Sequence, residues 1–143
     1  MESLKYRSDE DRLDTAGNQK SVELIDLSPL HGIWLNTNSE TRGIVKVIVG
    51  SSNGDGGDLT VNVFGACAPS PCDWGEIKAE TIYAASVGSK EGFAFSASYD
   101  FKFMEVYLQA NLSLGLLVVA GLNIFKDSSG RSNYFSREFF RQS

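Results

Sequence analysis

Apolar and polar residues alternate with a period of two through most of this chain, and no segment beyond the first 30 residues has apolar residues at helical spacing. The alternation is clearest from Leu59 to Phe64 and from Phe93 to Tyr99. Short alternating runs that are rich in β-branched and aromatic residues are typical of β-strands. The sequence therefore predicts an all-β fold.

Clusters of Asn, Asp, Ser and Gly separate these runs, as in residues 51–58, 88–92 and 127–130. Such clusters supply the positive φ angles that tight hairpins need. The expected strands are 32–38, 43–50, 58–66, 74–86, 92–100, 101–110, 113–125 and 132–141. With no crossover helix between them, we expect an antiparallel up-and-down eight-stranded barrel, whose closure removes the sheet edges. A sandwich of two sheets is the alternative.

The first 21 residues are predominantly polar and charged, and we expect residues 1–21 to form a flexible polar arm before a single barrel domain at 22–143. An arm that folds over a barrel mouth or a partner is the alternative. The start has no apolar signal region, and no apolar run approaches the length of a membrane span. We therefore expect a cytoplasmic protein that does not bind a membrane.

Composition excludes several classes of function. A net charge of −5 argues against nucleic acid as a partner, because binding phosphates needs a basic face. One histidine rules out a multi-histidine metal site, and two cysteines are too few for a disulfide framework. No cofactor or metal is expected. In the loop around Asn53, Asp55 and Asp58 the spacing of a calcium loop is not met, so a hairpin turn is expected there.

The first expected strand opens with Gly32 and, two residues later, Trp34. A glycine and a tryptophan in this position, at the head of an eight-stranded pattern, resemble the opening of the calycins, the group of lipocalins and avidins. The resemblance implies that Trp34 plugs one end of the barrel and that a basic residue of the last strand, Arg137 or Arg141, stacks on it.

The segment from Gly65 to Gly75 contains the most distinctive motif, C-x-P-x-P-C-D-W-G. It is similar to a motif of small bacterial proteins of unassigned function, and this resemblance implies a compact β-domain without indicating an activity. Two prolines stiffen the connection between Cys67 and Cys72, so a disulfide is geometrically feasible, although two thiols are the default in a reducing cytosol. Zinc would need two further ligands, and a cysteine nucleophile would have only His31 as its base. A rigid structural loop is therefore favoured.

Asp73 and Trp74 are the expected polar and apolar groups at the barrel mouth. A carboxylate there could orient a ligand, or act as a base if burial raised its pKa; the alternative is that Asp73 caps the turn and Trp74 is core. The candidate ligand-binding residues are Trp74, Asp73, Phe64, Phe95, Tyr99, Phe103 and Tyr107, and the candidate catalytic residues are Asp73, Glu105, Tyr99 and Tyr107. Glu80, Glu105 and Glu138 lie on strands, where an inward-facing carboxylate would be costly and therefore informative.

The segments 43–50 and 114–125 are apolar on both faces. One face can fill the interior, and the other needs cover from a second copy in a homodimer or from the segment 1–31.

Three functions follow from these observations. The first is a binding protein that holds a small apolar or amphipathic molecule in the barrel cavity. The second is an enzyme, a cyclase or isomerase, that shapes its substrate in the same cavity. The third is an interaction module without a pocket.

Overall fold

A computed structural model describes residues 25–52 and 58–143. The expected arm at 1–21 and most of the loop considered for calcium lie outside these described residues. A 3₁₀ turn, η2 (Ser28–Leu30), precedes the strands. The strands are β1 (Gly32–Asn36), β2 (Ile44–Ser51), β3 (Leu59–Gly65), β4 (Cys72–Lys78), β5 (Thr81–Ala84), β6 (Gly92–Asp100), β7 (Met104–Ser113), β8 (Leu116–Phe125) and β9 (Tyr134–Gln142).

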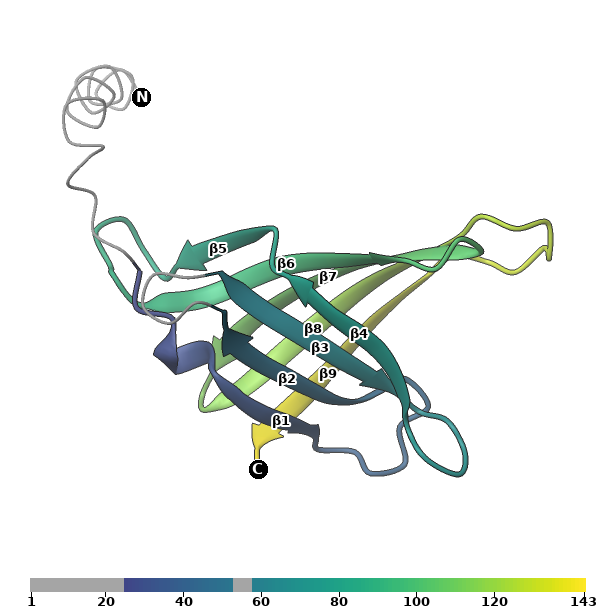
Figure 1. Ribbon diagram of the computed structural model, residues 1–143, viewed down its shortest axis with the longest axis horizontal. Coiled ribbons are helices and arrows are strands. Elements are labelled where there is room, and N and C mark those ends of the chain that lie inside the picture. The colour runs from purple at the N-terminus through teal and green to yellow at the C-terminus, as the bar shows by residue number, and fades with distance from the viewer. Residues whose placement is uncertain (1–24, 53–57) are drawn as a thin grey trace, which may run out of the picture.

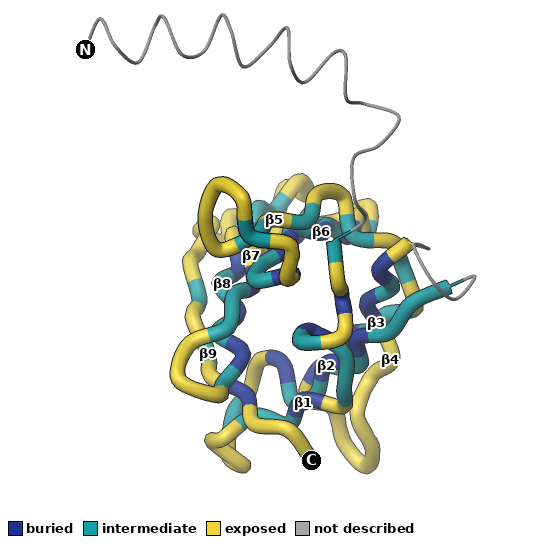
Figure 2. Tube along the Cα trace, turned by 90° about the vertical axis from the view of Figure 1, so that its left-hand side faces the viewer, coloured by how far each residue is buried: buried dark blue, intermediate teal, exposed yellow. Residues whose placement is uncertain are grey.

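All nine strands form one antiparallel sheet in the order β4-β3-β2-β1-β9-β8-β7-β6-β5. The sheet curls strongly around an interior, as Figures 1 and 2 show from two directions. The all-β class and the antiparallel connections are confirmed. The closed eight-stranded barrel is wrong, because the sheet is open between β4 and β5, and it is a single sheet rather than a sandwich.

The opening arises because the expected strand 74–86 divides in two and changes its partner. The first part, β4, pairs with β3, and the second part, β5, pairs with β6. The change takes place at two adjacent residues: the Ala79 amide donates to the Leu59 carbonyl at 2.8 Å, and the Glu80 amide donates to the Ser96 carbonyl at 2.7 Å. One short segment of chain thus connects the two edges of the sheet.

Two other strands begin later than expected because turns precede them. Leu114 and Gly115 have φ angles of 52° and 83° and connect β7 to β8, so the apolar run that starts at Leu114 begins in a hairpin turn rather than in a strand. Two consecutive positive φ angles are typical of a two-residue type I′ hairpin. Lys102, with a φ of 78°, lies in the turn between β6 and β7. A hydrophobic run alone does not reveal such a turn.

One end of the interior, which we call the filled end, is occupied by apolar side chains. Leu30 of η2 and Phe140 of β9 are fully buried, and Trp34 of β1 is 2% exposed. The Trp34 indole donates to the Leu30 carbonyl at 3.0 Å, which fixes η2 against the sheet. The buried residues around them include Val47, Val49, Leu59, Val61, Val63, Phe95, Ala97, Val119 and Leu117.

The last strand departs from the usual rule that apolar side chains face inward. Phe135 and Phe139 are 56% and 44% exposed, whereas Ser136 and Glu138 between them are partly buried and line the interior. Because successive side chains of a strand point to opposite faces, β9 presents phenylalanine outward and polar groups inward. This inversion leads to the site described next.

Candidate functional site

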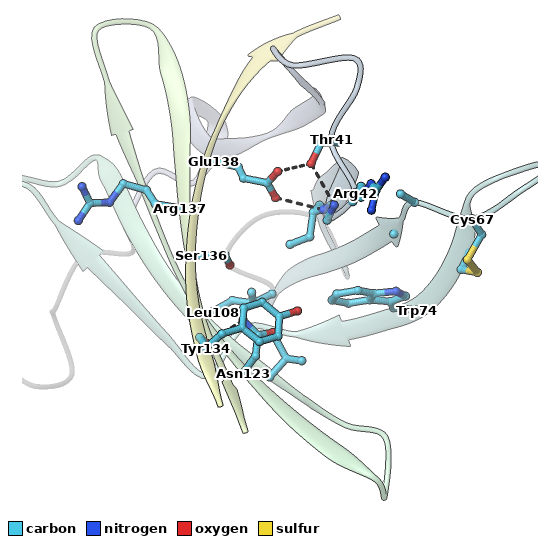
Figure 3. Close-up of a pocket in the computed structure, with 16 residues that line it drawn as sticks. Thr41, Arg42, Cys67, Trp74, Leu108, Asn123, Tyr134, Ser136, Arg137 and Glu138 are labelled. Carbon is cyan, nitrogen blue, oxygen red and sulfur yellow. Dashed lines mark hydrogen bonds between the residues drawn. A yellow bond between two sulfur atoms is a disulfide. The ribbon is translucent and has the colours of Figure 1, made fainter. Parts of the chain in front are cut away.

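The other end of the interior, which we call the hollow end, contains a cavity of about 610 Å³. Figure 3 shows the side chains that surround it. They come from the β1–β2 connection and from β2, β3, β4, β7, β8 and β9, with the start of the β3–β4 loop. The lining residues are Thr41, Arg42, Gly43, Ile44, Gly65, Ala66, Cys67, Cys72, Trp74, Val106, Leu108, Asn123, Tyr134, Ser136, Arg137 and Glu138. Several of them are exposed, so the cavity opens to solvent.

The cavity has an apolar wall and a polar wall. Ile44, Trp74, Val106 and Leu108 supply apolar surface from β2, β4 and β7. Asn123 of β8 supplies a polar group, together with Tyr134, Ser136 and Glu138 of β9. An apolar surface with a few convergent polar groups is typical of small-molecule sites.

Glu138 is the carboxylate that faces the interior. Its Oε1 accepts a hydrogen bond from the Ile44 amide at 3.1 Å, and its Oε2 accepts from Asn36 Nδ2 at 3.0 Å and from the Thr41 hydroxyl. A partly buried carboxylate is stable only when its oxygens are hydrogen-bonded, and three donors meet that need. Glu138 therefore holds the β1–β2 connection in place at the rim of the cavity.

Asn123 is the most buried polar residue that lines the cavity, at 6% exposure. Its Nδ2 donates to the carbonyls of Tyr134 at 3.2 Å and Gly121 at 3.4 Å. Its Oδ1 accepts no hydrogen bond from the described residues, and the indole N–H of Trp74 has no acceptor among them. Neither atom is among the buried side-chain polar atoms without a partner, so solvent reaches both. They are available to a molecule in the cavity.

The rim carries a positive charge and a disulfide. Arg42 is exposed and, within the described parts of the chain, forms no ion pair. Cys67 and Cys72 are joined by a disulfide across the β3–β4 loop, with their Cα atoms 5.5 Å apart. The loop thus presents its disulfide, rather than two thiols, at the entrance to the cavity.

Trp74 lines the cavity, but its neighbour Asp73 does not. The Asp73 Oδ1 accepts hydrogen bonds from Asn62 Nδ2 at 2.7 Å and from the Gly75 amide at 2.8 Å, on the outer side of the sheet. These two donors, Asn62 foremost, hold the pKa of Asp73 below its usual value. A lowered pKa makes this carboxylate a weaker base, and its position keeps it from the cavity.

Tyr99 lies behind Trp74 rather than in the cavity. The two rings meet edge to face with their centroids 5.4 Å apart, and Phe101 packs against both. The Tyr99 hydroxyl donates to the Gly75 carbonyl at 2.7 Å and accepts from the Val63 amide at 3.2 Å. Burial raises the pKa of Tyr99 to about 12. This cluster connects β4 and β6 across the opening of the sheet and supports the wall that Trp74 forms.

The other candidate ligand-binding residues are dispersed. Phe95 belongs to the core at 2% exposure, and Phe64 lies under the ammonium group of Lys46, which is 4.4 Å from its ring centroid. Phe103 is 45% exposed near the β6–β7 turn. Tyr107 is on the outer face, where its hydroxyl donates to Glu105 at 3.0 Å and this bond raises its pKa. Apart from Trp74, none of the candidate ligand-binding residues lines the large cavity.

The candidate catalytic and structural residues are placed as follows. Glu105 pairs with Lys126 at 3.2 Å on the outer face, and Glu80 accepts from Ser98 at 2.6 Å, so neither of these carboxylates lines the cavity. The guanidinium of Arg137 lies 5.6 Å from the ring of Phe135, not over Trp34, and Figure 3 shows it pointing away from the cavity. The stacking that the calycin resemblance implied is therefore wrong for Arg137, because its side chain is on the outer face of β9.

Asn123, Tyr134, Ser136 and Arg42 were not among the candidates from the sequence. Asn123 is an isolated amide in an apolar strand, which is a recognisable signal for an inward polar group. Tyr134, Ser136 and Glu138 share one face of the last strand, but Phe135 and Phe139 on its exposed face have the hydrophobicity expected of core residues. The sequence therefore indicates the alternation without indicating which face is inside.

Comparison with known proteins finds no matching family model, no similar curated protein and no similar solved structure. Among the described residues, no helix has the length and apolar character to span a bilayer. The same residues contain no group of three or more His, Cys, Asp or Glu side chains arranged to hold a metal ion.

Proposed function

We propose that this protein binds a small amphipathic molecule in the cavity of the hollow end. The observation that carries the proposal is the combination of an apolar wall with unpaired polar atoms on Asn123 and Trp74. Its volume of about 610 Å³ lies in the range of about 300–1,000 Å³ that is usual for small-molecule sites. A strand-walled interior used as a binding site is also what the calycin resemblance implies.

A cyclase or isomerase would use the same cavity, but the four residues expected to carry that chemistry lie elsewhere. Asp73, Glu105, Tyr99 and Tyr107 do not line it. The carboxylate that does, Glu138, is occupied by three donors that hold the rim. Binding without turnover is therefore the function that the geometry supports best.

The test places a leucine at two positions of β9 that point to opposite faces. Ser136→Leu puts its side chain into the cavity, whereas Arg141→Leu, the matched control, puts the same side chain on the exposed outer face of the strand. The probe is N-phenyl-1-naphthylamine, a neutral dye whose fluorescence rises in apolar surroundings. We expect the wild type and Arg141→Leu to bind the dye and Ser136→Leu to lose binding while keeping its β-sheet circular dichroism. Equal binding by all three proteins would show that the cavity is not the site.

One observation favours a second function, association with another copy through the outer wall. Phe135 pairs with Leu122 across β8 and β9, and Phe139 pairs with Val118, so the exposed phenylalanines continue into an apolar face. Arg137 and Arg141 alternate with them on the same face of β9. Sedimentation at micromolar concentration tests this: a dimer that Phe135→Ser and Phe139→Ser convert to monomer supports it, and a wild-type monomer contradicts it.

The cytoplasmic location stays a proposal, and the disulfide bears on it. Disulfides persist in oxidising compartments and are rare in the reducing cytosol. A cytoplasmic protein would therefore carry Cys67 and Cys72 as thiols. Thiol alkylation before and after reduction, in cells that express the natural gene, measures which form is present.

A further inference from the structure

Two charged groups at the cavity differ in whether their hydrogen-bonding atoms are occupied by the protein. Glu138 accepts hydrogen bonds from Ile44, Asn36 and Thr41, so its carboxylate oxygens are occupied within the fold. Arg42, beside Thr41 on the β1–β2 connection, has neither an ion pair nor a hydrogen bond from its guanidinium among the described residues. The charged group with free hydrogen-bonding atoms is therefore the guanidinium of Arg42.

The position of Arg42 relative to the walls defines the shape of the complementary molecule. Figure 3 shows Arg42 next to Thr41, on the opposite side of the cavity from Tyr134 and Asn123. A molecule with its charged group at Arg42 would extend inward along the apolar side chains of Trp74 and Leu108. Its inner end would meet Asn123 Oδ1, which accepts a hydrogen bond from a hydroxyl or an amide.

We infer that the ligand is an amphipathic organic anion, whose acidic group is bound by Arg42 and whose apolar body fills the hollow end. The inference rests on the proposed binding function and adds the charge of the ligand to it. A guanidinium binds carboxylate, sulfonate and phosphate oxygens through charge-assisted hydrogen bonds, and the anionic group, rather than the particular acid, is what Arg42 recognises.

Two dyes with the same aromatic body separate the charge from the apolar contact. The anionic dye is 8-anilinonaphthalene-1-sulfonate, and the neutral one is N-phenyl-1-naphthylamine. We expect Arg42→Gln to weaken the sulfonate about tenfold, the size of one hydrogen bond to a charged group, and to leave the neutral dye unchanged. The matched control is Arg141→Gln, which removes an equal charge from the outer face of the sheet and should change neither affinity.

Two further measurements keep the test independent of how well one variant folds. Arg42→Lys retains the charge and should retain most of the sulfonate affinity. In the wild type, added salt should weaken the sulfonate and not the neutral dye, because screening acts on the charged pair.

The outcomes distinguish a failure of the inferred ligand charge from a failure of the proposed binding function. If Ser136→Leu abolishes binding of both dyes but Arg42→Gln affects neither, the cavity is a binding site and the inferred ligand charge is wrong. An equal loss in Arg42→Gln and Arg141→Gln also overturns the inference, since it reflects net charge alone. If Ser136→Leu leaves both dyes bound, the proposed binding function itself fails.

Discussion

The filled and hollow ends of the interior are built from the same strands and differ in the size of the side chains that those strands send inward. At the filled end, the β8–β9 ladder pairs Leu117 with Phe140. Four residues along β8, the same ladder pairs Gly121 with Ser136. A Cβ on Gly121 would lie 2.7 Å from the Ser136 hydroxyl, so even alanine would crowd this position. Along this continuous β8–β9 ladder, the inward side chains are large at the filled end and small at the hollow end, which leaves space for the cavity.

The two ends of the interior have different roles: the filled end contributes to stability, and the hollow end provides the proposed binding site. Fully buried apolar side chains contribute most to the free energy of unfolding, and Leu30, Leu117 and Phe140 of the filled end are among them. The hollow end leaves surface uncovered, which forgoes the stability that burial would add and leaves room for a molecule.

The largest expected effect lies at the filled end. Phe140→Ala removes a fully buried ring, and we expect it to lower the free energy of unfolding by about 3–5 kcal/mol. Tyr134→Ala on the same face of β9, where the ring is 53% exposed, should cost less than about 1 kcal/mol. Urea denaturation followed by tryptophan fluorescence measures both. Similar losses for the two variants would contradict the division into a filled and a hollow end.

The disulfide at the rim gives an intermediate effect. It closes a short loop, and we expect its removal by Cys67→Ser with Cys72→Ser to cost about 2 kcal/mol, from the chain entropy that the unfolded state regains. Adding a reductant should lower the stability of the wild type to that of the double variant and leave the variant unchanged. A wild type that does not respond to the reductant would mean that the bond adds nothing to the rim.

A smaller effect is expected where Tyr99 supports the cavity wall from behind. Tyr99→Phe removes the hydroxyl that binds the Gly75 carbonyl and the Val63 amide. We expect a loss of about 1 kcal/mol at neutral pH, because the ring stays packed and only the hydrogen bonds are lost. The same variant should weaken dye binding slightly, through the loosened position of Trp74. A change in stability without any change in binding would separate the aromatic cluster from the site.

The stability difference between the wild type and Tyr99→Phe should depend on pH in one direction. Burial raises the pKa of Tyr99 in the folded protein to about 12, whereas a tyrosine in the unfolded chain has its ordinary pKa of 10.0. Between these values the unfolded state loses the proton and the folded state keeps it, so stability falls as pH rises through this window. The stability difference between the wild type and Tyr99→Phe should shrink between about pH 10 and pH 12. A difference that stays constant there would contradict a buried neutral phenol.

The sequence predicted the strands well and their closure poorly. Alternation located β3 and β6 almost to the residue, because one side of each is apolar enough to be recognised. The partner change at Ala79 and Glu80 left no such signal, since both halves of that segment retain strand character. For the site, Trp74 was found because its motif is distinctive. Ser136 was missed as a lining residue, and the face to which Glu138 points was left open, because Phe135 and Phe139, which face outward, have the hydrophobicity of an interior.

The partner change at Ala79 and Glu80 also has a consequence for how the chain could be rearranged. The strand order in the sheet is the order along the chain, started at β5 and continued from β9 to β1. The end of β9 lies beside β1, with the Ser143 amide donating to the Ile33 carbonyl at 2.9 Å. A circular permutant that begins at Glu80 and connects Ser143 to the segment before β1 would therefore be a plain meander, in which every neighbouring pair of strands is also consecutive in sequence. In the natural chain, the β1–β9 pairing must instead bring together residues about a hundred positions apart, a slow step in folding. The opening thus separates β4 and β5, which follow each other in the sequence, whereas β1 and β9, which are far apart in the sequence, are paired in the middle of the sheet.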